Sequence, residues 1–228
     1  MRRELAAIGI RTPWDLVQAL RNFARTVWDP TNADVRQGIN TLFYGALRDA
    51  DPGQLSALEA AQPEIAALFV EGYDPQLDPA RLERLPDGTL GREYLRFLRA
   101  NRIDPLGELL AMKQPTNFAE YLFRRAYKLH DVLHVALGCD ATVLGEVRIV
   151  AYTLGQARGA ATQAPALALA VLFLHLALRK PKDLPAAVRL AAEWQSLGER
   201  SRPYASFRFE DWMDRPVAEV RERIMASA

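Results

Sequence analysis

Residues 130–146 read HDVLHVALGCDATVLGE, and they hold two of the three histidines in the 228-residue chain. The preceding residues 117–129 have the pattern of a helix, so His130 and His134, four positions apart, are expected on one helical face. Asp131 lies three positions before His134 and is expected beside it. The stretch therefore predicts a compact group of one carboxylate and two imidazoles.

A glycine after the histidines predicts a turn into a second helix. Gly138 can take the left-handed conformation that ends a helix, and Asp140 or Thr142 can cap the next one. A short connection makes the two helices antiparallel neighbours, so Glu146, in the first or second turn, is expected to face the histidines. Two imidazoles with one or two carboxylates suit a divalent metal such as zinc, with a position left for water or a ligand.

Two other interpretations of the stretch stay open. In the first, His130 and His134 are half-buried core residues, Asp131 pairs with Lys128, and no metal binds. In the second, the protein is a metallohydrolase, because H-D-x-x-H resembles the helical H-E-x-x-H of zinc proteases. The side chain of Asp131 is one methylene shorter than the glutamate that activates water in those enzymes. A phosphohydrolase built on a His–Asp dyad is rejected, because no histidine precedes residue 130.

Composition and charge are those of an ordinary globular protein. Half of the residues are hydrophobic, a quarter are charged, and the net charge is +1, which gives no electrostatic argument for nucleic-acid binding. The one cysteine, Cys139, cannot form an internal disulfide, and this fits a reducing compartment. The first residues, MRRELAAIGIRTPWD, have no apolar core of the kind that a signal peptide needs.

Apolar residues recur at helical spacing along most of the chain, and no strand-like alternation is long enough to predict a sheet. We therefore predict an all-α, single-domain helical bundle with a buried metal-binding helix pair and a central apolar helix. The main helices are expected at 12–27, 32–48, 55–70, 89–101, 117–137, 142–157 and 165–178. Residues 72–88, which are rich in proline, aspartate and glycine, are expected to form a surface loop.

The apolar helix is expected at residues 165–178, PALALAVLFLHLAL. Its 14 residues are too few to span a bilayer, which needs about 20, so we expect the central buried helix of the bundle. The alternatives are the wall of a long apolar pocket and a surface that touches lipid. His175, which lies within this run, is expected to be a hydrogen-bonded core histidine.

Residues 198–228 are expected to be a turn-rich C-terminal segment that ends in a helix. Glu210 and Asp211 within it are expected to be surface carboxylates. Three aromatic side chains are expected to pack the segment onto the body: Phe207, Phe209 and Trp212.

The spacing of the four polar residues, His130-Asp131-x-x-His134-x11-Glu146, resembles the signature of the coenzyme Q (ubiquinone) biosynthesis protein 4 family. The resemblance covers roughly residues 14–224. Matching residues outside the signature are Thr89, Leu90, Gly91, Tyr94, Phe97, Arg125, Gly138, Thr142, Gly145, Gln156, Phe209, Glu210, Trp212, Pro216, Glu219 and Arg221. The chain departs from the family beside the site, where Val150 and Thr153 replace the usual Lys and Glu and residues 157–160 replace Gly-Leu-Pro.

This resemblance implies that His130, Asp131, His134 and Glu146 are metal ligands. It also implies a homodimer that works at membrane surfaces, with a prenylated quinone precursor or a prenyl phosphate and other quinone-biosynthesis proteins as partners. The implied function is a metal-dependent oxidative decarboxylation of the ring carbon that carries the carboxylate, which would make the protein a lyase. The alternative is a non-catalytic prenyl-lipid carrier or scaffold that organises the biosynthetic complex.

A hypothesis for the chemistry follows from the resemblance. The ion, expected to be Zn²⁺ with Mg²⁺ or Fe²⁺ as alternatives, would bind the carboxylate or phenolate of the aromatic ring. Arg125 is the further catalytic candidate, because its charge could stabilise the ring as carbon dioxide leaves. Zinc cannot accept electrons, so dioxygen or another protein would have to take them. No amphipathic targeting extension precedes residue 14, so we expect a bacterial, cytoplasmic member that associates peripherally with the inner (plasma) membrane.

Overall fold

The computed structural model describes residues 21, 24–25, 27–29, 52–104 and 114–226. Within these ranges the secondary structure is helical, apart from one isolated bridge between Thr89 and Pro216. The predicted all-α, single-domain class is therefore confirmed. None of the described helices combines the length and the apolar character that crossing a membrane requires.

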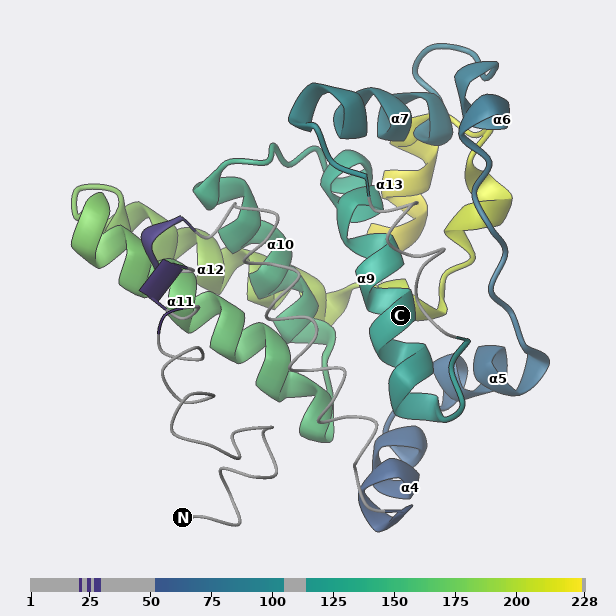
Figure 1. Ribbon diagram of the computed structural model, residues 1–228, viewed down its shortest axis with the longest axis horizontal. Helices are drawn as coiled ribbons and strands as arrows, with labels where there is room; N and C mark the ends of the chain where they lie inside the picture. Colours follow the sequence, from purple (N-terminus) through teal and green to yellow (C-terminus); the bar gives the residue numbers. More distant parts are fainter. Residues whose placement is uncertain (1–20, 22–23, 26, 30–51, 105–113, 227–228) are drawn as a thin grey trace.

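The long helix α9 (Phe118–Leu137) organises one half of the molecule (Figure 1). Helices α4 (Pro52–Ala60) and α5 (Pro63–Glu71) contact its N-terminal part, where the rings of Phe69 and Phe118 meet edge to face. Two helices, α7 (Leu90–Asn101) and α13 (Val217–Met225), contact its C-terminal part. The short helix α6 (Pro79–Glu83) packs against α7.

Helix α10 (Val143–Gln156) turns back from α9 and begins the other half, where it packs against α11 (Gln163–Arg179) and α12 (Leu184–Arg200) (Figure 1). The contact between α10 and α12 is the most extensive between any two of the described helices. Because α10 contacts both α9 and α12, it connects the two halves of the fold.

Two glycines allow α10 and α12 to approach this closely. A Cβ atom placed on Gly155 would lie 2.1 Å from the carbonyl oxygen of Gln195. A Cβ atom on Gly198 would lie 2.2 Å from the carbonyl oxygen of Tyr152. Both distances are well below van der Waals contact, and the obstructing atoms belong to the backbone, so any larger residue would push the helices apart.

Several helices lie where the sequence predicts them, and others do not. Helices α7, α9, α10 and α11 begin and end within two residues of the predicted ranges. The predicted helix 55–70 is two helices, because Pro63 disfavours helical backbone at Gln62 and starts a new helix itself. Helix α12 was not among the predicted main helices, and α6 interrupts the predicted loop 72–88. The predicted helix 32–48 and most of 12–27 lie outside the described residues.

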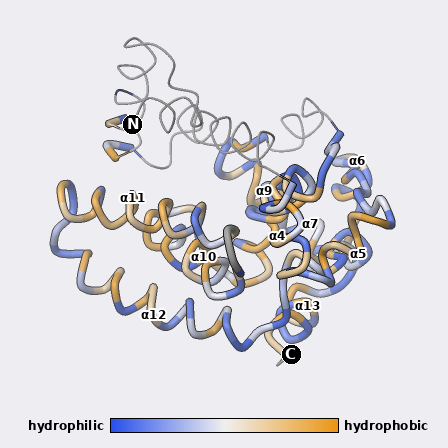
Figure 2. The backbone as a smooth tube through the Cα atoms, turned by 90° about the horizontal axis from the view of Figure 1, so that it is seen from below, coloured by the Kyte–Doolittle hydropathy of each residue, from blue (hydrophilic) through white to orange (hydrophobic). Residues whose placement is uncertain are grey.

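Helix α11 is apolar along its length (Figure 2), but it is buried on one side only. Leu169, Leu172 and Leu176 pack against α10 and α12. The opposite face carries the exposed side chains of Leu167 (50 %), Leu174 (39 %) and Leu178 (66 %). The expectation of a central buried helix is therefore met on one face of α11 only.

His175 on α11 is the hydrogen-bonded core histidine that the sequence predicts. Its side chain is buried, and its Nδ1 lies 2.8 Å from the carbonyl oxygen of Val27. This bond ties α11 to one of the few described residues that precede residue 52.

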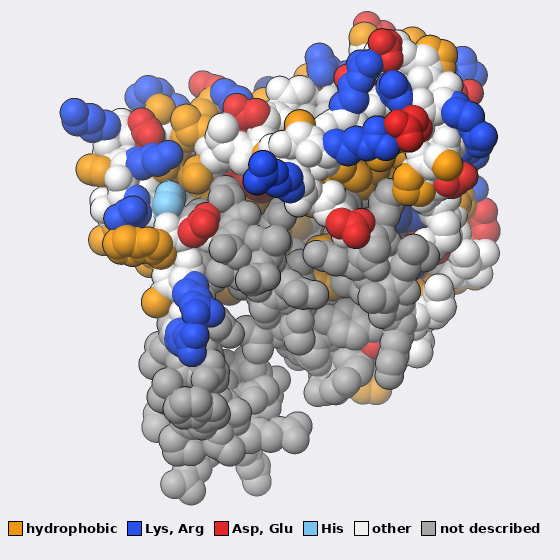
Figure 3. Space-filling model, turned by 45° about the horizontal axis from the view of Figure 1, so that its top comes forward, with side chains coloured by type: hydrophobic (Ala, Val, Ile, Leu, Met, Phe, Trp, Pro, Cys, Tyr) orange, Lys and Arg blue, Asp and Glu red, His pale blue; other side chains and the backbone are white. Residues whose placement is uncertain are grey.

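The surface over α6 and α7 mixes charges of both signs (Figure 3). Arg96 lies 2.6 Å from Asp87, and Arg99 lies 2.7 Å from Glu83. These pairs are exposed to water, which screens them, so they contribute little to stability. Because the charges on this face are paired, it gives no argument for a polyanionic partner.

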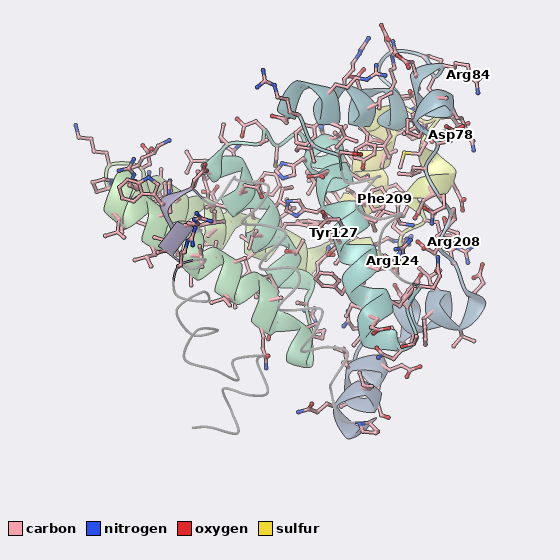
Figure 4. All side chains as sticks on the ribbon, in the orientation of Figure 1. Asp78, Arg84, Arg124, Tyr127, Arg208 and Phe209 are labelled. Atoms are coloured by element: carbon pink, nitrogen blue, oxygen red, sulfur yellow. The ribbon has the colours of Figure 1, made fainter. Side chains whose placement is uncertain are left out.

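The C-terminal segment packs against α9 and completes the core; Figure 4 labels Arg124 of α9 and Arg208 and Phe209 of this segment. Phe209 is part of the main core, and Phe207 and Trp212 pack against it, as the sequence predicts. Glu210, expected on the surface, is buried instead. Burying an isolated carboxylate would cost free energy, but Glu210 is paired with two cations of α9, which offset this cost.

Candidate metal centre

Local capping interactions set the geometry of the stretch that carries the histidines. Helix α9 ends at Gly138, whose φ of 72° lies in the left-handed region that favours glycine. The next helix starts at Thr142, whose hydroxyl accepts a hydrogen bond from the amide of Gly145 at 3.2 Å. The connection between the helices is short, so the first turn of α10 faces the last two turns of α9.

This arrangement brings together His130, His134 and Glu146. Each residue offers one ligand atom, and these atoms all lie within 4.8 Å of one another. Nε2 of His130 lies 3.2 Å from Oε2 of Glu146, and Nε2 of His134 lies 3.5 Å from Oε1. Ligand atoms bonded at about 2.1 Å to a tetrahedral ion lie about 3.4 Å apart, and the separations of the two imidazoles from Glu146, one to each carboxylate oxygen, are close to this value.

His134 is the least ordinary member of this triad. Its side chain is 0 % exposed, and neither ring nitrogen has a hydrogen-bond partner among the described residues. Buried polar atoms without partners are rare because they lose hydration and gain nothing in return. Nε2 lies 3.5 Å from Oε1 of Glu146 without making a hydrogen bond, and a metal ion held between the two atoms would give both of them a partner.

Glu146 is held in the ionised form that binds metals. Burial alone would raise the pKa of Glu146, but His130 and His134 outweigh it and keep the pKa below its ordinary value of 4.5. The His130 side chain is 31 % exposed, so the triad has one side open to the surface. The donor set is then two imidazoles and one carboxylate, which is a common catalytic zinc set with a position left free.

Asp131 is the one predicted ligand that does not join this group. It lies on α9 between the two histidines in sequence and is buried. Asp131 interacts electrostatically with Tyr94 of α7. Burial raises the pKa of the Tyr94 hydroxyl, and the negative charge of Asp131 raises that pKa further. The assignment of Asp131 as a metal ligand stays a prediction.

Arg125, the predicted catalytic arginine, binds the C-terminal segment. Its guanidinium donates to the carbonyl oxygens of Ala205 and Phe207, and its Nη1 lies 3.1 Å from Oε1 of Glu210. A role in stabilising charge on a substrate would require it to leave these partners. That role also stays a prediction.

Lys128 also contacts Glu210. One interpretation of the sequence expected Lys128 to pair with Asp131, but it pairs with other carboxylates. Its ammonium lies 2.7 Å from Oδ1 of Asp74 and 2.6 Å from Oε1 of Glu210. Asp74 also accepts from Nε of Arg124 at 2.8 Å. These buried charges hold together α9, the chain around Asp74 and the C-terminal segment.

Helix α7 supplies a wall of the site that the sequence did not identify. The ring of Phe97 stacks on the imidazole of His134, with centroids 5.2 Å apart and planes 23° apart. Tyr94, one turn earlier, is fully buried, and its hydroxyl has no hydrogen-bond partner among the described residues. Both residues lie in the predicted helix 89–101, but a helix predicted from sequence does not say which neighbouring helix its apolar side chains face.

Comparison with known proteins identifies relatives of the chain. The family model described as "Coenzyme Q (ubiquinone) biosynthesis protein Coq4" matches residues 73–227. The mitochondrial ubiquinone biosynthesis protein COQ4 homolog of Rattus norvegicus is 32 % identical over 154 residues, 65 % of this chain and 54 % of that protein. The homolog of Homo sapiens is 42 % identical over 76 residues, 31 % of this chain and 27 % of that protein. The chain thus spans about half the length, or less, of these curated relatives.

A solved structure has the same fold. The crystal structure of a candidate ubiquinone biosynthesis protein from Nostoc punctiforme PCC 73102 superposes with a TM-score of 0.66. The alignment covers 90 % of this chain and 95 % of that one at 23 % sequence identity. At this identity the likeness concerns the fold alone.

Proposed function

This chain belongs to the coenzyme Q (ubiquinone) biosynthesis protein Coq4 family, and we propose that it is a metal-dependent protein of ubiquinone biosynthesis that acts on a polyprenylated aromatic precursor. The observation that carries the proposal is the convergence of His130, His134 and Glu146, with His134 fully buried and its Nε2 lying 3.5 Å from the Glu146 carboxylate. We propose Zn²⁺ as the ion, with Mg²⁺ and Fe²⁺ as alternatives.

The proposed reaction is the oxidative decarboxylation of the ring carbon that carries the carboxylate. A divalent ion, when bound, supplies Lewis acidity toward a carboxylate or phenolate oxygen. The chain supplies an ionised Glu146, two imidazoles at fixed separation and a buried setting that strengthens electrostatic interactions. Carbon dioxide leaves the ring carbon, a hydroxyl group with oxygen from water or dioxygen takes its place, and the two electrons released pass to dioxygen or to a partner protein.

The exposed face of α11 supports a role for membrane lipid in this function. It presents Leu167, Leu174 and Leu178 to the surroundings, and the positively charged side chains of Lys180 and Lys182, exposed as well, follow at its end. An apolar helix face beside basic residues suits the surface of an anionic bilayer. We propose that the protein meets its lipid-soluble substrate there, as a peripheral membrane protein.

The same features fit a prenyl-lipid carrier, and one experiment separates the two functions. The purified protein is analysed for bound metal and then incubated with a polyprenyl-hydroxybenzoate in vesicles under dioxygen. Bound metal together with release of carbon dioxide supports the enzyme. Bound metal with stoichiometric binding of the substrate and no turnover supports the carrier.

Variants connect either outcome to the site. His134→Ala should abolish metal binding and any turnover while the helical circular dichroism stays unchanged. His175→Asn, which alters the remaining histidine outside the triad, should keep the metal. The proposal fails if the native protein binds no divalent ion, or if a metal-free preparation keeps its full activity.

A further inference from the structure

The last turn of α9, which carries His134, ends in a local hydrogen-bonded turn. A helix leaves its last four carbonyl groups without partners inside the helix. The amide of Cys139 donates to the carbonyl oxygen of His134 at 2.8 Å. The amide of Gly138 donates to the carbonyl oxygen of Val135 at 3.2 Å. These two bonds form the Schellman motif, so the backbone of a proposed metal ligand is part of the turn.

A third carbonyl group, that of Ala136, is met from outside α9. Nε of Arg221, on α13, donates to this oxygen at 2.8 Å. The same guanidinium lies over Gly138, where a Cβ atom would be 3.0 Å from Nη2 of Arg221. A positive charge beside the C-terminus of a helix also interacts favourably with the helix dipole. One arginine from the tail therefore completes the end of α9 and covers the glycine of its turn.

Helix α13 gives this arginine a firm support beside the C-terminal part of α9 (Figure 1). Val220 and Ile224, on either side of Arg221 in sequence, are fully buried in the main core. The amide of Val217 donates to the carbonyl oxygen of Gly88 at 3.0 Å, which ties the start of α13 to the segment before α7. The helix that carries Arg221 is therefore fixed at both its start and its buried face.

The turn beneath Arg221 sets the separation of the metal-binding side chains. His130 and His134 precede the turn on α9, and Glu146 follows it on α10. Only residues 138–142 join the two helices, so a change in this connection shifts Glu146 relative to both imidazoles. The ligand atoms lie within 4.8 Å of one another, and metal sites tolerate displacements of only about 0.2 Å. Loosening the turn should therefore weaken metal binding without altering any ligand.

We propose that Arg221 is a positioning residue of the metal centre, which holds the turn between α9 and α10 closed and so keeps Glu146 in register with the histidines. The inference rests on the proposed metal centre and deepens it, because it extends the centre to the C-terminal helix. Arg221 acts through the backbone of Ala136 and the turn at Gly138, while the ligand atoms belong to other residues.

The first test measures the turn in the metal-free protein. Cys139 is the one cysteine of the chain and is buried in this turn, so its reaction with a chromogenic disulfide reagent reports opening of the turn. Arg221→Gln should react about fivefold or more faster than the native protein, because the turn loses a hydrogen bond and opens more often. Arg223→Gln removes the same charge from an exposed position of the same helix and should react at the native rate.

The second test measures the zinc affinity of the same variants by competition with a chromogenic chelator. The dissociation constant of Arg221→Gln should rise about fivefold or more, as expected of a residue that acts on a site without contacting its ligand. That of Arg223→Gln should stay at the native value. Arg221→Lys keeps a charge and a donor, so both of its values should lie between those of the native protein and Arg221→Gln. It also provides the test if circular dichroism shows that Arg221→Gln does not fold.

The two measurements separate the possible outcomes. Native labelling of Cys139 in Arg221→Gln would show that the turn holds without the arginine. Faster labelling with native zinc affinity would show a merely structural cap, and equal changes in Arg223→Gln would show an effect of net charge. Each of these results would overturn the inference. Absence of zinc binding in the native protein would instead reject the proposed function, and the labelling rates would still decide whether Arg221 holds the turn.

Discussion

Arg125 and Glu210, 85 positions apart in sequence, form a buried ion pair with 3.1 Å between Nη1 and Oε1. The same Glu210 oxygen lies 2.6 Å from the ammonium of Lys128. Burial alone would raise the pKa of Glu210, but the two cations outweigh it and lower the pKa below its ordinary value of 4.5. Glu210 is thus charged at neutral pH, and its charge joins the C-terminal segment to α9.

This pair predicts how stability depends on pH. When folding lowers the pKa of a carboxyl group, that group stabilises the folded protein. The stabilisation is complete at pH values above the ordinary pKa, and it is lost as the pH falls through the lower pKa of the folded state. Glu210→Gln should cost about 3–5 kcal/mol at pH 7, because two buried cations lose their shared partner. The variant should also lose less additional stability than the native protein as pH falls below 4.5.

Urea unfolding at a series of pH values measures both effects, with the exposed Glu199→Gln as control. Parallel pH profiles for native protein and Glu210→Gln would contradict the prediction.

Zinc should stabilise the native protein against heat. An ion that binds only the folded state adds about 2.7 kcal/mol at a free concentration 100 times its Kd. For a chain of this length, that corresponds to a rise in Tm of about 5–10 °C. A chelator should reverse the rise, and His134→Ala should show none. An equal rise in the His134→Ala variant would place the bound zinc elsewhere.

Gly145→Ala should weaken metal binding through the backbone. A Cβ at this position would lie 1.9 Å from the carbonyl oxygen of Asp140, so the first turn of α10 would have to move. Glu146 is the next residue, and metal sites tolerate ligand displacements of only about 0.2 Å. We expect the zinc dissociation constant to rise at least about tenfold, as measured by competition with a chromogenic chelator. An unchanged constant would mean that the turn relaxes without moving Glu146.

Gly198→Ala makes the same chemical change on α12, at its contact with the second half of α10. Glycine to alanine within a helix ordinarily stabilises by about 1 kcal/mol, but here the Cβ would lie 2.2 Å from the carbonyl oxygen of Tyr152. We expect a net loss of about 2 kcal/mol or more in denaturant unfolding, with zinc affinity unchanged. A more stable variant would show that α10 and α12 can separate freely.

The parts of the fold that depend on neighbours in sequence could be predicted. His130 and His134 share a face because they are four residues apart, and Gly138 and Thr142 mark the turn that brings Glu146 back to them. Helix α12 was missed although Pro185 marks its first turn and small apolar residues such as Ala187 and Ala191 recur along it. Alanines give a weak apolar signal, so such a helix is recognised only when its partner helix is known.

Contacts between distant segments could not be predicted in the same way. Nothing in residues near Glu210 indicates that it meets Arg125 and Lys128 in the core, because single carboxylates are normally exposed. The placement of Phe97 against His134 also depends on how α7 crosses α9. These relationships are set by tertiary packing, and they decide which predicted residues reach the site.

The bonds between Arg125 and residues 205–210 also constrain the order of events during synthesis. Helix α9 leaves the ribosome before residues 205–210 do, so Arg125 in a nascent chain lacks the carbonyl and carboxylate oxygens that it contacts in the folded protein. Domains generally fold as units, and this half of the molecule can close only once its tail has emerged. A translational stall upstream of Ala205 would leave the histidine-bearing helix open to proteases and chaperones.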